Sequence, residues 1–559
     1  MLSITEIYPE SRDELLEIII GLLAKNGEQN AKIEELKASI RLLETQQEQV
    51  ESRLYIYEER VRVLLHKLYG KSSERAVPEQ GKLFNEAEAI ADTEPAEETE
   101  VQTVTYERKK KGRRALPEDL PHERIEYDLP EAEQCCPECG EPMHRMGEDV
   151  RSELKIVPAQ VIVVDHVKFK YGCRNCEKNN ETVPIVTAPA PNPVIKRGNS
   201  SPSAMAYVMT AKFVDGVPLY RQEAHLARLG LEISRSVLSN WMIKGSELLE
   251  PIYVAAHHIL IDQEIAHVDE TTLQVLNEPE RSAETKSYMW LYRTGRDALQ
   301  PIILYEYQET RAGEHPKKFL SGFKGYIHVD GYSGYDRLEQ SKKAGEPPDI
   351  KLCSCWAHFR RKADEALKGL PLDKRRNSRT EELLNRINKL FAVERKLVDN
   401  TTEARQSKRQ EQSRPIVDDL FKWLNDFKNE ILPKSLLGTA VTYGLNQWDK
   451  LTRFFEDGRI ELTNNLAERS IKPFVIGRKN FLFCNTPSGA KASAIIYSII
   501  EMAKANGLNP YAYLVYLFER LPNMDTTNVA AIDELLPWNV NLPKKPVAAK
   551  TPQNNTPHR

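Results

Sequence analysis

The 559-residue sequence predicts a multidomain α/β protein. Three observations indicate this class: a long heptad pattern near the start, two cysteine pairs with metal-ligand spacing, and a later region where short apolar runs alternate with helical ones. A chain of this length exceeds what one hydrophobic core usually supports, so several folded units are expected. The net charge of −4 indicates no particular partner, because the charges gather in separate blocks of opposite sign.

Targeting signals and membrane spans are not expected. The sequence holds no run of 18 or more apolar residues, and its first residues lack the basic and apolar regions of a secretory signal. Without export, the eight cysteines are expected to be metal ligands or inert thiols rather than disulfides.

Residues 13–70 carry a helical pattern whose apolar positions alternate at spacings of three and four. Starting from Ile33, the seam comprises Leu36, Ile40, Leu43, Val50, Leu54, Tyr57, Val61, Leu64 and Leu68, with Gln47 as a polar exception. A sustained 3.5-residue repeat predicts a coiled coil, and therefore a homo-oligomer. A single amphipathic helix on a globular core is the alternative. Residues 71–120 follow as a charged linker with too few apolar residues to fold, and its basic block either follows phosphates or is simply solvated.

Residues 121–190 contain the strongest metal signal. Two Cys-x-x-Cys pairs supply four thiolates: Cys136, Cys139, Cys173 and Cys176. Four thiolates from two tight turns suit the closed tetrahedral site of one structural Zn²⁺ per chain. The segments 161–164 and 167–171 predict a hairpin between the pairs, which gives a zinc-ribbon-like module. A redox site is the alternative, and the adjacent Cys135 could compete as a ligand.

Residues 200–260 read as helices in a helix-turn-helix-like arrangement. One helix opens at Pro218 and stops at Gly230, and the next begins near Ile233 with a polar leading face. The residues placed to meet DNA are Arg221, Arg235, Ser236 and Asn240. Helix pairs with glycine turns are common, so an ordinary helical hairpin is the alternative.

Residues 261–525 form the predicted catalytic region. His-Val-Asp occurs at 267–269 and again at 328–330, each time as the end of a short apolar run that leaves for a polar turn. Between the two lie strand-like segments at 288–292 and 301–307, and a short helix at 315–320. Three strands, a helix and a parallel strand predict a ribonuclease-H-like mixed sheet, with a helical insertion at about 364–435. Histidines 267 and 328 lie deeper in their strands and are expected to be structural.

Asp269 and Asp330 could share hard cations, and Glu468 offers a third carboxylate. Glu468 is expected early in a helix capped by Asn464 or Asn465, and residues 477–480 read as a basic turn that enters a strand at 481–483. Two Mg²⁺ (or Mn²⁺) ions about 4 Å apart suit displacement at phosphorus. The basic side chains expected to hold a phosphate backbone are His358, Arg360, Arg361, Lys472, Arg478 and Lys479. An exposed Glu468 paired with Lys472 is the alternative.

These residues resemble a known family. The segments that carry the resemblance are Asp269-Glu270-Thr271, Asp330-Gly331-Tyr332-Ser333-Gly334-Tyr335, Cys355-Trp356-Ala357-His358 with Arg360-Arg361, and Asn464-Asn465-Leu466-Ala467-Glu468-Arg469 through Gly477-Arg478-Lys479-Asn480. Over roughly residues 30–525 the chain is similar to the large transposase of insertion-sequence family sixty-six, and the Glu468 motif is the most specific part.

The resemblance implies an Asp-Asp-Glu transposase that binds terminal inverted repeats and cuts and joins DNA with metal ions. Its triad would be Asp269, Asp330 and Glu468. Such a protein would work at the nucleoid in the bacterial cytoplasm, with small accessory proteins as possible partners. A basic, Pro-rich tail at 526–559 departs from the family layout. Another metal-dependent nuclease or resolvase, and an inactive DNA-binding protein derived from a transposase, are the alternatives.

Overall fold

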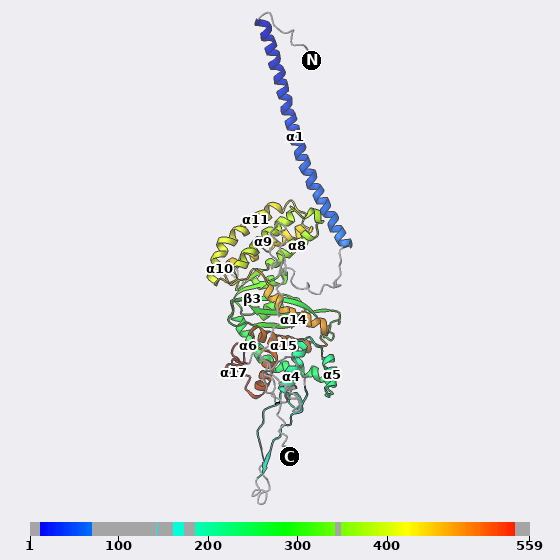
Figure 1. Ribbon diagram of the computed structural model, residues 1–559, viewed down its shortest axis with the longest axis vertical. Coiled ribbons are helices and arrows are strands. Elements are labelled where there is room, and N and C mark those ends of the chain that lie inside the picture. The colour runs from blue at the N-terminus through cyan, green and yellow to red at the C-terminus, as the bar shows by residue number, and fades with distance from the viewer. Residues whose placement is uncertain (1–11, 70–140, 142–159, 173–184, 341–347, 543–559) are drawn as a thin grey trace. The chain divides into compact units, whose positions relative to one another are not determined.

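The computed structural model describes residues 12–69, 141, 160–172, 185–340 and 348–542 (Figure 1). The four cysteines of the predicted zinc module, the linker at 71–120 and the end of the tail lie outside these residues. These described residues divide into two compact units, one formed by residues 12–69 with 353–463 and the other by those from 141 to 352 with 464–542. None of the described helices is long and apolar enough to span a membrane.

The first unit is helical. Its long helix α1 (Arg12–Tyr69) confirms the helical prediction, and the seam residues Ile33, Leu36, Ile40 and Leu43 are each about half exposed in the single chain. The remaining helices are α8 (Trp356–Lys368), α9 (Arg379–Leu397), α10 (Thr402–Lys408), a π-helical turn η4 (Arg409–Ser413), α11 (Arg414–Phe427), α12 (Leu436–Asn446) and α13 (Trp448–Thr452), with short 3-10 turns at Leu372–Lys374 and Arg453–Phe455. The helical region is therefore wider on both sides than the predicted 364–435.

The second unit contains a mixed five-stranded sheet in the order β5-β4-β3-β6-β7. The strands are β3 (Ile265–Gln274), β4 (Lys286–Thr294), β5 (Ile303–Gln308), β6 (Gly325–Val329) and β7 (Ile350–Ser354). β4 pairs antiparallel with β3 and β5, whereas β6 is parallel to β3. Gly325, the first residue of β6, has φ +134°, and a Cβ there would lie 2.2 Å from the Glu264 carbonyl oxygen. Only glycine therefore lets β6 start this close to the residue that precedes β3.

Helices cover this sheet. They are α4 (Pro202–Phe213), α5 (Leu219–Arg228), α6 (Arg235–Ile261), α7 (Glu314–Phe319), α14 (Asn465–Phe481), α15 (Pro487–Ala505), α16 (Pro510–Arg520) and α17 (Val529–Asp533), with 3-10 turns η2 (Ser333–Glu339) and η6 (Leu521–Asn523). α15 packs on β5 of the sheet and on α6, whose label lies beside that of α15 in Figure 1. α14 packs on β3 and β4. Small residues on α15 let this helix approach β5 closely. At this contact the Tyr305 backbone N–H of β5 donates to Ser498 Oγ of α15 at 2.8 Å.

Several expectations need correction. β3 continues five residues beyond Asp269, because its antiparallel pairing with β4 extends to Gln274. Residues 161–164 form no strand; instead β1 (Lys170–Gly172) pairs with β2 (Ile185–Thr187).

The basic segment 477–480 is the end of helix α14 and not a turn into a strand. The predicted tail also begins too early. Residues up to 542 are described, and Ile532, Leu535 and Leu536 are buried. These three apolar residues, which stand among polar ones in the sequence, hold the segment on the folded unit.

Candidate active site

Asp269 and Asp330 lie on adjacent parallel strands. The register places Ile265 opposite Tyr326 and His267 opposite His328, so the two aspartates follow at equivalent positions. Asp269 lies within β3 and accepts the Glu270 backbone N–H at 2.9 Å. Asp330 follows the last residue of β6 and accepts the Tyr332 N–H at 2.8 Å. Both carboxylates are half-buried.

Glu468 comes from the first turn of α14 and is half-buried. The helix start is fixed by Asn464, whose side chain does not cap the helix as the sequence suggested. Its Oδ1 accepts a hydrogen bond from His267 Nδ1 at 2.9 Å, and its Nδ2 donates to the Val268 carbonyl oxygen at 2.8 Å. Asn464 is 1 % exposed, so these bonds pin the first residues of α14 to the strand that carries Asp269.

Further contacts from the sheet hold α14. Arg293 on β4 donates to the Leu466 carbonyl oxygen at 3.1 Å and to Ser470 Oγ at 2.6 Å. The Tyr305 hydroxyl on β5 donates to the Ser470 carbonyl oxygen. Three strands therefore fix the turn of α14 on which Glu468 sits.

A fourth carboxylate, Glu270, lies next to Asp269 and belongs to a separate network. Its side chain is 1 % exposed, and Arg311 Nε donates to it at 2.6 Å while the Tyr335 hydroxyl donates to its other oxygen. The Arg311 guanidinium is also 3.9 Å from Asp330 and lies 3.8 Å from the centre of the Tyr332 ring. Glu270, Arg311 and the two tyrosines thus brace the turn that follows Asp330.

The electrostatics of the site suit a bound cation. Burial raises the pKa of Asp269 well above its ordinary value, and the charges of Glu270, Glu468 and Asp330 raise it further. Arg311 is engaged by Glu270, so its charge offsets little of this repulsion. Within the described part of the chain, the oxygens of Asp269, Asp330 and Glu468 do not all lie within 4.8 Å of one another. The donors are hard oxygens with excess negative charge, which is the chemistry Mg²⁺ prefers.

The paired histidines are core residues. His267 and His328 are 0 % and 2 % exposed, and their rings stack with centroids 5.1 Å apart. Burial, followed by the charge of His328, lowers the pKa of His267 well below its ordinary value. A neutral ring fits its role in holding Asn464.

The helix-turn-helix-like residues are all exposed. Arg221 lies on α5, and Arg235, Ser236 and Asn240 lie on the first two turns of α6. Glu223 on α5 accepts the Arg235 backbone N–H at 3.0 Å, which links the two helices and satisfies one open donor at the start of α6.

The other predicted DNA contacts divide into two groups. His358, Arg360 and Arg361 lie on α8 of the helical unit, where Arg360 is 3 % exposed and donates to Asn388 at 2.7 Å, so its guanidinium joins α8 to α9 and is not available to a phosphate. On α14, Lys472 and Lys479 are exposed. Arg478 donates to Thr272 Oγ1 at 2.9 Å, which ties the end of α14 to β3.

Sequence reasoning missed Asn464, Arg293 and Arg311 as positioning residues. Arg293 and Arg311 lie in a strand and a loop whose local sequence resembles any charged surface. Their partners are 173 and 41 residues away along the chain, and no spacing rule links them. Only Asn464 lay within a motif, where capping was the more obvious role.

Comparison with protein families identifies a transposase. A model described as "Transposase IS66 family" matches residues 197–492, and three more match: "zinc-finger binding domain of transposase IS66" at 133–177, "IS66 C-terminal element" at 498–538 and "Transposase C of IS166 homeodomain" at 56–125. The chain belongs to the IS66 transposase family, and its zinc-binding and DNA-binding character follows from these domains.

Curated relatives are similar to this chain over most of its length. The uncharacterized protein y4jD of Sinorhizobium fredii is 31 % identical over 430 residues, which cover 76 % of this chain and 81 % of that protein. The uncharacterized protein y4qI of the same organism is 29 % identical over 545 residues, covering 95 % and 97 %. The family models confirm the resemblance to this family.

Proposed function

We propose that this transposase catalyses metal-dependent cleavage at the ends of its insertion sequence and strand transfer into target DNA, with Asp269, Asp330 and Glu468 as catalytic residues. The observation that carries the proposal is the Asp269 carboxyl, which lies on the central strand and is acted on by the charges of both other members of the triad. Repulsion among half-buried carboxylates costs free energy and is relieved when cations bind.

The sheet supports a ribonuclease-H-like fold for this unit. In chain order its strands are three antiparallel neighbours, β3, β4 and β5, followed by β6, which is parallel to β3 on the other side. That order brings the first and fourth strands together, so their carboxylates meet at one place. Function does not follow from a fold alone, and the proposal rests on the residues at this place.

The proposed reaction balances without any further reactant. A water oxygen forms a bond to phosphorus at the element end and the bond from phosphorus to the 3′ oxygen breaks, which leaves a 3′-hydroxyl and a 5′-phosphate. The 3′-hydroxyl then attacks a target phosphodiester, whose own 3′ oxygen leaves. Two Mg²⁺ ions held by the triad would activate the attacking oxygen and stabilise the leaving one.

The protein's own groups orient this chemistry. Asp269 within β3, Asp330 just after β6 and Glu468 on the first turn of α14 would hold the ions. Asn464 and Arg293 hold Glu468 in place, and the Arg311 network holds the turn after Asp330.

The module at 133–177 is proposed to hold one Zn²⁺ through Cys136, Cys139, Cys173 and Cys176. Support comes from the family match and the ligand spacing. Metal analysis of protein prepared without chelator should give about one zinc per chain. Substitution Cys136→Ser should lower this content, and an unchanged content would contradict the ligand set.

The helix α1 is proposed to join copies of the chain. In the described part of its apolar seam, Ile33, Leu36, Ile40 and Leu43 are exposed in the single chain, which leaves surface that a partner helix would bury. Light scattering of the full chain should show an oligomer. Replacing Leu36 and Leu43 by Glu should shift it toward the monomer.

The central test uses full-length protein, Mg²⁺ and a duplex carrying the terminal repeat of the element that bears the gene. Nicked and joined strands are expected, and Glu468→Gln should form neither while still binding the duplex. Full activity of Glu468→Gln would refute the triad. Cleavage without joined products would favour a nuclease or resolvase, and metal-independent binding without cleavage would favour an inactive DNA-binding protein.

A further inference from the structure

The segment after α14 exposes two large apolar side chains in a strained turn. Leu482 has φ +66° and ψ −52°, and the Phe483 backbone N–H bonds to the Phe481 carbonyl oxygen at 2.8 Å. This is a γ-turn of the rare, strained form, which is unfavourable for a branched residue such as leucine. Leu482 is 64 % exposed and Phe483 is 42 % exposed, so burial of their side chains does not explain the strain.

Both ends of this γ-turn are firmly held. On one side, the Leu482 N–H bonds to the Arg478 carbonyl oxygen at 2.7 Å, and Arg478 is itself tied to Thr272 of β3. On the other side, Cys484 donates to the Gln274 carbonyl oxygen at 2.9 Å and forms an isolated bridge with Val275. The apolar tip is therefore fixed to the far end of the strand that carries Asp269.

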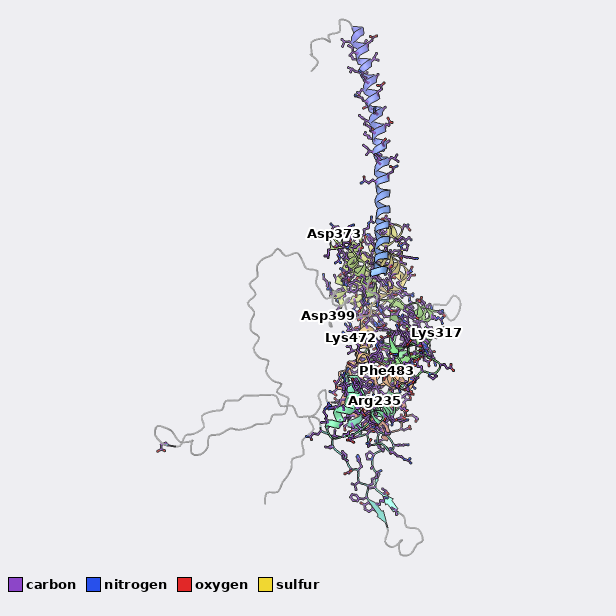
Figure 2. All side chains as sticks on the ribbon, turned by 90° about the vertical axis from the view of Figure 1, so that its right-hand side faces the viewer. Arg235, Lys317, Asp373, Asp399, Lys472 and Phe483 are labelled. Carbon is purple, nitrogen blue, oxygen red and sulfur yellow. The ribbon has the colours of Figure 1, made fainter. Side chains whose placement is uncertain are left out.

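An exposed basic stripe on α14 leads to this tip. The exposed positions spaced three or four residues apart along one helix face are Arg469, Lys472, Ile476 and Lys479, and the exposed Asn480 follows Lys479. Residues 469–485 contain no acidic residue. Figure 2 labels Lys472 and Phe483, which follow one another down this unit in that view. The stripe starts beside Glu468 and ends at Leu482.

The length of the stripe gives a position on DNA. Leu482 lies fourteen residues after Glu468, directly after the end of α14, which corresponds to about 21 Å at 1.5 Å per residue. The independent route along β3, from Asp269 to Gln274, gives about 17 Å. At 3.4 Å per base pair these lengths correspond to roughly five to six steps.

We propose that Leu482 and Phe483 form an apolar wedge that unstacks DNA bases about five to six pairs from the bond that is cut, while the stripe follows the backbone. The charge of the stripe identifies nucleic acid as the occupant, and apolar side chains inserted at base steps are an established means of unstacking. The wedge rests on the proposed function for the position of the cut but has its own readout.

The test places 2-aminopurine at each of the ten positions on either side of the cut bond in a terminal-repeat duplex and measures its fluorescence with full-length protein. Binding of the wild-type protein should raise emission severalfold at about the fifth or sixth position, because an unstacked 2-aminopurine is less quenched. Phe483→Ala and Leu482→Gly should each remove most of this rise.

Leu482→Gly separates the wedge from folding. Glycine adopts positive φ without strain, so this variant should unfold at a temperature equal to or a few degrees above wild type while losing the signal. Leu299→Ala, at a leucine that is 98 % exposed in the β4–β5 turn, is the matched control and should behave as wild type.

The outcomes separate this inference from the proposed function. Cleavage products without any local rise in emission overturn the wedge alone, as does an unchanged rise in Phe483→Ala. Variants that unstack normally but change oligomeric state would show that the pair covers a second copy of the chain. A rise at the expected position with no cleavage in Mg²⁺ overturns the function and leaves the wedge.

Discussion

His267-Val268-Asp269 and His328-Val329-Asp330 are identical tripeptides on adjacent parallel strands, with one histidine stacked on the other. After them the segments diverge. β3 continues through an antiparallel pairing, so Asp269 stays inside a sheet among other carboxylates. β6 ends at Val329, so Asp330 starts a turn and faces Arg311. Identical sequence thus gives one aspartate surrounded by carboxylates and one beside a guanidinium, and the difference arises from their neighbours among the described residues.

Removing each aspartate in turn gives the largest expected effect. Asp269→Asn and Asp330→Asn should each lower Mg²⁺-dependent strand cleavage by on the order of a thousandfold or more, because the ions lose a ligand. Their stabilities should differ. In chelator, Asp269→Asn should raise the melting temperature by removing a repelled charge, whereas Asp330→Asn should lower it slightly by weakening the contact with Arg311. Equal shifts of the two melting temperatures, measured by calorimetry, would show that the surroundings of the two aspartates do not differ in this way.

Arg311→Ala tests what makes the second segment different. Glu270 would keep a buried charge without its guanidinium, so the free energy of unfolding should fall by about 2–3 kcal/mol, a value reduced because Arg311 is partly exposed. Urea unfolding measures the change. The double variant Glu270→Gln with Arg311→Ala should recover a large part of the loss, and no recovery would show that Arg311 acts through other contacts.

Asn464→Ala tests the histidine side of the comparison. It removes two buried hydrogen bonds to β3 and should lower the free energy of unfolding by roughly 2 kcal/mol. Cleavage should fall about tenfold, because Glu468 lies on the helix turn that these hydrogen bonds hold in place. Asn465→Ala, one residue further along, is the matched control and should change both quantities much less. Comparable losses in the two variants would show that the Asn464 hydrogen bonds to β3 do not hold Glu468 in place.

Glu306 on β5 separates burial from repulsion between carboxylates. Burial raises its pKa to about 7, opposed by hydrogen bonds from Gln308 and Tyr292, with no carboxylate among the causes. A raised folded-state pKa contributes stability that is full below the unfolded pKa of about 4.5 and is lost as the pH rises through about 7.

The variant Glu306→Gln should lack this slope. Relative to wild type it should gain about 1–2 kcal/mol of unfolding free energy between pH 4 and pH 8, allowing for partial solvent screening. Urea unfolding at both pH values measures the gain. Gln308→Ala keeps the carboxyl and removes a hydrogen bond that lowers its pKa, so its stability should fall with rising pH at least as much as that of wild type. Parallel pH profiles for Glu306→Gln and wild type would mean that this carboxyl titrates normally.

Much of the fold was predictable from local pattern. The segments 288–292 and 301–307 are β4 and β5, and the helix at 315–320 is α7, because aromatic and β-branched runs bounded by turn residues read clearly as strands. Predictions failed where a partner far along the chain decided the outcome. Asp269 reads as a strand end until β4 extends the pairing, and residues 481–483 read as a strand although only Cys484 meets one.

The sequence by itself determined the family, the strands that carry Asp269 and Asp330, and the helix that carries Glu468, since these depend on residue types at short spacing. The tertiary structure decided how they are held. Asn464 bonds to β3 across 196 residues, and Arg311 reaches Glu270 across 41. A buried polar group must find a partner wherever the fold brings one, and no local pattern in the chain specifies that partner.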